Sequence, residues 1–370
     1  MSDVEYKTLY DCGEPQAPEE KAISSSARRN FLKVAGGSLV AAALPALASP
    51  LAQYPPAAAP SSLGAAFHSP LGQVQPRTLS AEGVTFEYFD FGNPRGVPLV
   101  LVHGFPDSPL AWESVVNHLD LSQVRIIAPY LGGYGRSTVQ RNELLSGQFA
   151  ALGSDLLVLL EALNIRTFHL AGHDWGARTS YAASVLAPDR VLTLTALASP
   201  YLAWKGELLP PAQVHGYWYQ LYFQVDAART MLSEHRADFC KELWKVWSPA
   251  YHFSDATFAA AAAAWDNPQF VPIVLNYYRI RWGDASGKPA YSNLEARLDV
   301  KPPPQIAVPT VFIQGDADAC DLLHGADGQE KAFSSSYKRV VLQNVGHFPH
   351  RENPPAVAAA ISDQIRSKAA

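Results

Sequence analysis

Cysteine, net charge and long apolar runs are all scarce in this chain of 370 residues. It has three cysteines, and none has the spacing of a metal site, so no metal is expected. The formal net charge of −5 gives no reason to expect nucleic acid as a partner. No apolar run reaches the roughly 20 residues that cross a bilayer, so no stable membrane span is expected. With 48% hydrophobic residues, the chain is long enough to bury a large core.

The N-terminus has the order of an export signal. Arg28 and Arg29 precede an apolar run at 34–44 and a small-x-small pattern at 46–48. The arginine pair resembles a twin-arginine signal, which predicts a periplasmic or extracellular protein. A short amphipathic or anchoring helix is the alternative interpretation.

Residues 1–48 are therefore predicted to be the signal, and the Pro/Ala/Ser-rich residues 49–76 a flexible leader. Cys12 would leave with the signal. Cys240 and Cys320 could pair in an oxidising compartment or remain free thiols, and the sequence leaves both possibilities open.

Strands and helices alternate after the leader. Leucine spacing predicts a helix at 154–163. Apolar or alternating runs predict strands at 84–89, 97–102, 124–128, 167–171, 191–197, 308–313 and 337–342. This alternation predicts an α/β fold with a mostly parallel central sheet flanked by helices. Functional residues are expected at the carboxyl ends of the strands.

A candidate nucleophile follows one of these strands. Gly172-His173-Asp174-Trp175-Gly176 has the form of a nucleophile elbow, with Asp in the place often held by Ser. The glycines allow the tight turn, and the next helix begins at the point where its dipole favours an anion. Asp174 is ionised at neutral pH and could attack a saturated carbon to form an alkyl ester.

The base and its acid partner are expected near the C-terminus. His347 follows the last predicted strand and could deprotonate a water molecule. Asp318 follows the strand before it and could hold the tautomer of His347, which gives the order nucleophile, acid, base of this fold. Asp316 and Asp321 are rivals for the acid, and His350 is a weaker rival for the base, expected to be a surface or loop histidine.

The loop from His103 to Asp107 follows another buried strand. In such folds this loop and the residue after the nucleophile supply the backbone N–H groups of an oxyanion hole. These would be the N–H groups of Phe105 and Trp175.

The loop at 103–106 (H-G-F-P) and the elbow at 172–176 (G-H-D-W-G) resemble the epoxide hydrolases of the α/β-hydrolase fold. The resemblance extends from about residue 75 to the C-terminus. It implies a helical cap at 201–304, inserted between two parts of the core at 77–200 and 305–370.

The resemblance further implies that two cap tyrosines, Tyr219 and Tyr278, donate protons to the epoxide oxygen. Phe105, Trp175, Trp218 and Tyr277 are expected to line the substrate pocket. The expected substrates are a small apolar epoxide and water, no cofactor is implied, and the oligomeric state, monomer or homodimer, is left open. The segment from Tyr130 to Ser137 departs from the family's Asp-x-Arg-Gly loop, so a local ion pair is expected to be missing.

Three other functions are considered. A haloalkane dehalogenase would use the same Asp174, Asp318 and His347, and Trp175 suits halide binding, but Phe105 stands where such enzymes tend to have a polar residue. A fluoroacetate-type dehalogenase would have an arginine in place of Trp175, and a serine esterase is disfavoured by Asp174. A non-catalytic ligand-binding member of the fold is the alternative from another class.

Overall fold

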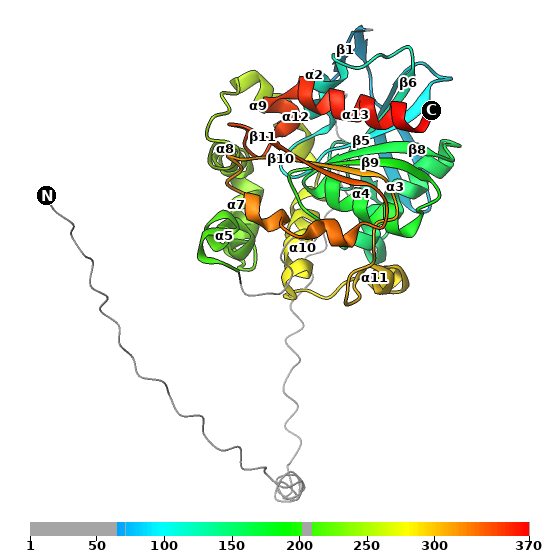
Figure 1. Ribbon diagram of the computed structural model, residues 1–370. Coiled ribbons are helices and arrows are strands. Elements are labelled where there is room, and N and C mark those ends of the chain that lie inside the picture. Colours follow the sequence, from blue (N-terminus) through cyan, green and yellow to red (C-terminus); the bar gives the residue numbers. More distant parts are fainter. Residues whose placement is uncertain (1–64, 71, 202–208, 370) are drawn as a thin grey trace, which may run out of the picture. The chain divides into compact units, whose positions relative to one another are not determined.

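The computed structural model describes residues 65–70, 72–201 and 209–369 (Figure 1). The predicted signal at 1–48, with Cys12, lies outside these residues. Within them, no helix is both long enough and apolar enough to cross a membrane.

A nine-stranded sheet forms the centre of the fold, with the strand order β11-β10-β9-β8-β5-β6-β4-β3 and with β7 paired to β4. The strands are β3 (Arg77–Ala81), β4 (Val84–Gly92), β5 (Val97–Val102), β6 (Val124–Pro129), β7 (Thr138–Val139), β8 (Phe168–His173), β9 (Val191–Leu197), β10 (Thr310–Gly315) and β11 (Tyr337–Leu342). From β6 to β11 along this order all pairs are parallel, whereas β4 pairs antiparallel with its neighbours. The prediction of a mostly parallel sheet is confirmed.

Helices cover both faces of the sheet (Figure 1). On one face lie α3 (Phe149–Ala162) and α4 (Trp175–Leu186), and on the other lie α2 (Glu113–Val116), α12 (Pro349–Glu352) and α13 (Pro354–Ala369). Because both faces are covered, the central strands are buried, as are all six residues of β8. β5 lies between β6 and β8, so the chain reverses its direction of travel across the sheet here, and the carboxyl ends of β5 and β8 are where such sheets place their ligand sites.

The fold begins earlier than the sequence predicts. β1 (Phe67–Ser69) and β2 (Gly72–Val74) form a small antiparallel sheet within the segment predicted to be a flexible leader. Phe67 is fully buried, and its ring packs 5.3 Å from that of Phe89 and 4.9 Å from that of Phe91. The predicted boundary at residue 76 was wrong because one buried aromatic side chain fixes this segment on the core.

A helical insertion, defined here as Pro211–Leu298, separates β9 from β10. Its described residues contain no strand. It comprises α5 (Pro211–Gly216), α6 (Trp218–Tyr222), α7 (Ala227–Glu234), α8 (Arg236–Trp247), α9 (Asp255–Ala262), α10 (Phe270–Trp282) and α11 (Ser292–Leu298). The indole N–H of Trp244 donates to the carbonyl of Pro106 at 2.9 Å, so the insertion is fastened directly to the loop after β5.

The loop at 130–137 has an ion pair after all. The guanidinium of Arg136 lies 2.7 Å from the carboxylate of Glu87, which is fully buried on β4. The backbone N–H of Arg136 donates to the same carboxylate at 2.5 Å. The local pair expected to be missing is thus replaced by one in which the acid comes from a distant strand rather than from the loop itself.

Cys240 and Cys320 are both buried free thiols. The choice that the sequence left open is therefore settled in favour of two unpaired cysteines.

Asp155 on α3 is half-buried, and removal from water raises its pKa from 3.8 to about 7. A folded-state pKa above the unfolded value means that stability is fully present below the unfolded pKa and falls as the pH rises through about 7. We expect Asp155→Asn to be more stable than the parent near pH 8 and no more stable near pH 4. Denaturant unfolding at both pH values, with Asp363→Asn as the exposed control, tests this, and a gain of equal size at both would contradict it.

Candidate active site

The candidate nucleophile lies in the turn between β8 and α4. Asp174 has a backbone φ of +52°, a conformation that residues with side chains seldom adopt. A Cβ atom on Gly172 would overlap the carbonyl oxygen of Gly176, and one on Gly176 would overlap that of Val102. The two glycines let the backbones pack closely enough to hold the turn, so the carboxylate of Asp174 is presented at the end of the sheet.

The structure brings the three predicted triad residues together. Nδ1 of His347 lies 2.9 Å from Oδ2 of Asp318, and Nε2 of His347 lies 3.7 Å from Oδ2 of Asp174. All three side chains are buried. The Asp318 contact is a hydrogen bond, whereas the Asp174 contact is longer than one. His347 is therefore oriented by Asp318 and faces Asp174 across a gap.

Hydrogen bonds separate Asp318 from its two rivals. Its other oxygen accepts the backbone N–H groups of Cys320 at 2.8 Å and Asp321 at 3.0 Å. Asp316 is exposed and accepts the backbone N–H of Asn344. Asp321 accepts the hydroxyls of Tyr217 and Ser199 (the latter at 2.8 Å). Of the three acids, Asp318 is the one directed at His347.

Burial and charge set the protonation of the pair. Burial would lower the pKa of His347, but the carboxylates of Asp318 and Asp174 outweigh it and raise the pKa well above its usual value. Burial would likewise raise the pKa of Asp174, but its interaction with His347 keeps that pKa below the usual value. These directions favour a negative charge on Asp174 beside a positive charge on His347, while burial raises the pKa of Asp318.

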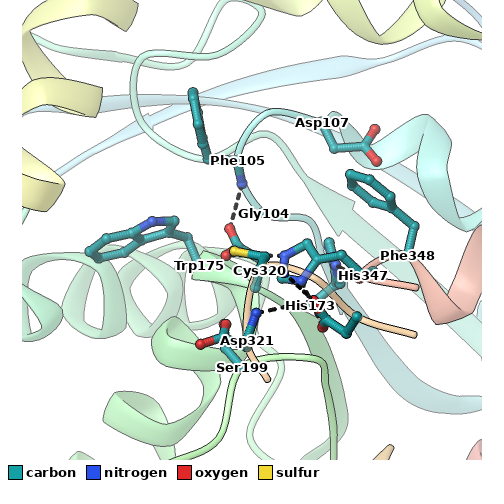
Figure 2. A network of polar contacts seen from close by, with 12 residues as sticks. Gly104, Phe105, Asp107, His173, Trp175, Ser199, Cys320, Asp321, His347 and Phe348 are labelled. Carbon is teal, nitrogen blue, oxygen red and sulfur yellow. Dashed lines mark hydrogen bonds and ion pairs between the residues drawn. The ribbon is translucent and has the colours of Figure 1, made fainter. Parts of the chain in front are cut away.

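The predicted oxyanion hole meets the nucleophile directly. The backbone N–H of Phe105 donates to Oδ1 of Asp174 at 2.8 Å (Figure 2). A Cβ on Gly104 would come within 2.5 Å of the Asp174 Cβ, so this approach requires glycine. Trp175 begins α4, and the first N–H groups of a helix have no partner within it. Oδ1 is thus the oxygen held by the backbone, which leaves Oδ2 on the side of His347.

Tyr219 and Tyr278 lie together over this site. Both are buried, and their rings are 5.3 Å apart. The hydroxyl oxygen of Tyr278 accepts the indole N–H of Trp175 at 3.0 Å, and that of Tyr219 accepts the side-chain amide of Gln220 at 2.9 Å. Burial raises the pKa of both phenols, and the charge of Asp174 raises them further. Both tyrosines therefore keep their protons.

Three of the four predicted pocket residues surround the site. Phe105 packs against the rings of both tyrosines, and Tyr277 stacks on Trp175 with ring centroids 4.3 Å apart. Trp218 is different: it is 36% exposed and packs against Phe239 at the surface of the insertion. Helical spacing explains this, because Trp218 precedes Tyr219 and adjacent helix residues point in different directions.

Comparison with known proteins agrees with this geometry. Residues 97–354 match the model of the α/β hydrolase fold family. The chain belongs to this family. It is 34% identical to a candidate epoxide hydrolase from Klebsiella pneumoniae of known structure, with a TM-score of 0.74 and coverage of 79% of this chain and 97% of that one.

Two curated relatives carry the same description. Epoxide hydrolase A of Mycobacterium tuberculosis is 26% identical over 79% of this chain and 97% of its own length. An epoxide hydrolase of Caballeronia sordidicola is 26% identical over 80% of this chain and 93% of its own. Within the α/β hydrolases, the chain therefore belongs with the epoxide hydrolases.

One group in the described chain has the spacing of a metal site: Cys320, Asp321 and His347, with ligand atoms within 4.8 Å of one another. Asp321 accepts the hydroxyls of Tyr217 and Ser199, and Nδ1 of His347 is hydrogen-bonded to Asp318, whereas Nε2 of His347 faces Asp174 at 3.7 Å. Burial raises the pKa of the Cys320 thiol, which keeps it protonated and a weak ligand. The hydrogen bonds account for this cluster without an ion.

His350 is a correction to the sequence analysis. It is fully buried rather than a surface or loop histidine, and its ring lies 4.3 Å from that of His173. Its Nε2 lies 3.9 Å from Asp107, whose carboxylate forms a two-point ion pair with Arg351 at 2.6 and 2.8 Å. α12 thus ties the loop after β5 to the loop that carries His347.

The sequence analysis missed the support of the His347 loop. The carboxylate of Glu352 accepts the backbone N–H groups of Gly346 at 2.8 Å and Phe348 at 3.0 Å. It also accepts the hydroxyl of Ser248, whose oxygen in turn accepts the N–H of His347 at 2.7 Å. The spacing of Glu352 five residues after His347, in a loop that leads into a helix, was the available signal.

We expect Glu352→Ala to lose about 1–3 kcal/mol of unfolding free energy, because three donors lose their partner. The loss of turnover should fall mainly on kcat, since His347 is displaced while the substrate contacts remain. Denaturant unfolding and steady-state kinetics measure these, with Glu242→Ala as the control for an exposed carboxylate. Equal stability of the two variants would show that Glu352 does not hold the loop.

Proposed function

We propose that the chain hydrolyses an apolar epoxide to a vicinal diol through a covalent ester on Asp174. The supporting observation is the placement of the Asp174 carboxylate, with Oδ1 held by the Phe105 N–H and Oδ2 facing His347. Its epoxide hydrolase relatives support the reaction class. The helical insertion acts as the cap of the active site, since it contributes Tyr219 and Tyr278.

In the first step, Oδ2 of Asp174 attacks an epoxide carbon and the carbon–oxygen bond of the ring breaks. Tyr219 or Tyr278 transfers its proton to the developing alkoxide. Each phenol oxygen already accepts one N–H, from Gln220 and Trp175 respectively, so its own hydrogen is the one left to donate. In Tyr219 a substrate oxygen would replace Sγ of Cys320, 3.6 Å away, as the partner of the hydroxyl. The same N–H groups stabilise the phenolate that forms.

Ester formation then changes the protonation of His347. The negative charge of Asp174 disappears, so one of the two charges that raise the pKa of His347 is lost. His347 gives its proton to replace the one that the tyrosine lost and becomes a neutral base. Asp318 retains the orientation of the ring through Nδ1.

In the second step, His347 takes a proton from water as the hydroxide attacks the ester carbonyl. The oxyanion forms at Oδ1, where the N–H groups of Phe105 and Trp175 stabilise it. The intermediate collapses, the proton of the added hydroxyl passes to the leaving alkoxide, and the diol departs. Asp174 is again ionised and His347 protonated, as in the resting site.

His347→Gln should trap the substrate on Asp174, because the first step does not need a base. Intact-mass spectrometry is expected to show the protein mass increased by the mass of one epoxide. The double variant Asp174→Asn, His347→Gln is the control and should show no increase. An unmodified single variant that has consumed one equivalent of epoxide would contradict the ester mechanism.

Haloalkane dehalogenation is the second candidate, supported by Trp175 beside the nucleophile. Its indole N–H is already donated to Tyr278, which makes it less available to a halide. We expect diol from a panel of epoxides and no halide from a panel of haloalkanes. Halide release without diol would leave the triad in place but return the two tyrosines to pocket lining. Folded protein without either product would favour the non-catalytic alternative.

A further inference from the structure

A cavity lies beside α4, one helical turn beyond Asp174. It has a volume of about 540 Å³ and is lined by Arg178 and Tyr181 of α4, Arg281 of α10 and residues that follow α11. Arg178 is four residues after Asp174, which is a rise of about 6 Å along the helix. The volume is within the roughly 300–1,000 Å³ of small-molecule sites.

Arg178 stands between this cavity and the reaction centre. Its guanidinium lies 5.6 Å from the ring centroid of Trp175 and 5.9 Å from that of Phe149. Burial would lower the pKa of Arg178, but the nearby carboxylates, first Asp321 and then Asp174, raise it. Residues four apart lie on the same face of a helix, so an anion bound by Arg178 would lie on the same side of α4 as Asp174.

The guanidinium of Arg178 has hydrogen-bonding capacity to spare. Its side chain is only 7% exposed and, within the described part of the chain, makes ring contacts but no hydrogen bond. The nearby acid, Asp321, already holds Tyr217 and Ser199. A guanidinium has five N–H donors, and Arg178 lines the cavity. A planar anion such as a carboxylate could accept two parallel hydrogen bonds from the guanidinium of Arg178.

The rest of the cavity wall also favours an anion. Burial and the charge of Arg178 lower the pKa of Arg281 to about 10, and Lys301 adds a third positive group. Glu295 and Asp299 are the acids of the wall. The Glu295 carboxylate accepts the backbone N–H of Ala150 at 3.1 Å, at the start of α3. The cavity wall thus has three basic side chains and two acidic ones, and its formal charge is positive.

We propose that this cavity binds the carboxylate of the substrate, through the guanidinium of Arg178. The preferred epoxide then has an apolar body and a carboxylate on a short spacer, which refines the apolar substrate proposed above. This rests on the proposed epoxide hydrolysis. Phe149, Tyr181 and Leu298 supply an apolar wall for the spacer. Arg178 is then a specificity-determining residue, because it distinguishes a charged substrate from a neutral one of the same shape.

The test uses an epoxide of hexenoate and the neutral amide of the same acid. The unmodified protein should prefer the acid, chiefly through a lower KM. In Arg178→Met the ratio of kcat/KM for acid over amide should fall roughly 10- to 100-fold, as expected for a charged hydrogen-bond pair. The ratio for Arg178→Lys should lie between those of the unmodified protein and Arg178→Met, because lysine keeps the charge but cannot form the two parallel hydrogen bonds. Lys338→Gln removes an exposed positive charge on β11 and should leave the ratio unchanged.

The outcomes separate the two proposals. An unmodified protein with no preference for the acid, or a ratio that Arg178→Met leaves unchanged, overturns the carboxylate site. If the unmodified protein turns over neither epoxide, the epoxide reaction is overturned but the carboxylate site is not. Calorimetry then decides the site: tighter binding of hexanoate than of hexanol supports it, and equal binding overturns it. If Arg178→Met does not fold, Lys301→Gln should lower the acid preference by roughly two- to five-fold, and an unchanged preference would count against the proposal.

Discussion

The strained turn at Asp174 is the constraint on which the rest of the site depends. A carboxylate at a positive φ is held there because Gly172, Gly176 and Gly104 allow three backbone segments to meet without side chains between them. The same close packing places the Phe105 N–H on one carboxylate oxygen and leaves the other toward His347. A side chain at any of these glycines would move the nucleophile and the oxyanion hole apart, and the rigid central strands supply the packing that maintains the strain.

Electrostatics follow from that placement. Two carboxylates and one imidazole share a buried site, and the two carboxylates raise the pKa of His347, which favours a positive charge between them. This charge balance would change in the proposed reaction, since an ester on Asp174 removes its negative charge and makes His347 more ready to give up its proton. The arrangement therefore links the state of the nucleophile to the availability of the base. Glu352 keeps the base in position by binding the backbone on both sides of it.

The helical insertion contributes two hydroxyl groups to the site. The hydroxyls of Tyr219 and Tyr278 are oriented by N–H donors from Gln220 and Trp175, so one donor comes from the insertion and the other from the core. This sharing makes the position of the insertion over the sheet a condition for the proposed proton donation. Arg178 and the adjacent cavity extend the same principle, with a core residue meeting a wall built partly from α10 and the segment after α11.

The sequence by itself determined the parallel sheet and the identity of Asp174, Asp318 and His347 as candidates, because strand periodicity and glycine-bracketed turns are local properties of the chain. It also pointed to Tyr219 and Tyr278 through family resemblance. Tertiary structure alone decided which of three carboxylates faces His347, that Glu87 pairs with Arg136, that His350 is buried, that Trp218 is at the surface and that Phe67 fixes the start of the fold. Each of these depends on contacts between residues far apart in the chain, and such contacts leave no periodic pattern in the sequence.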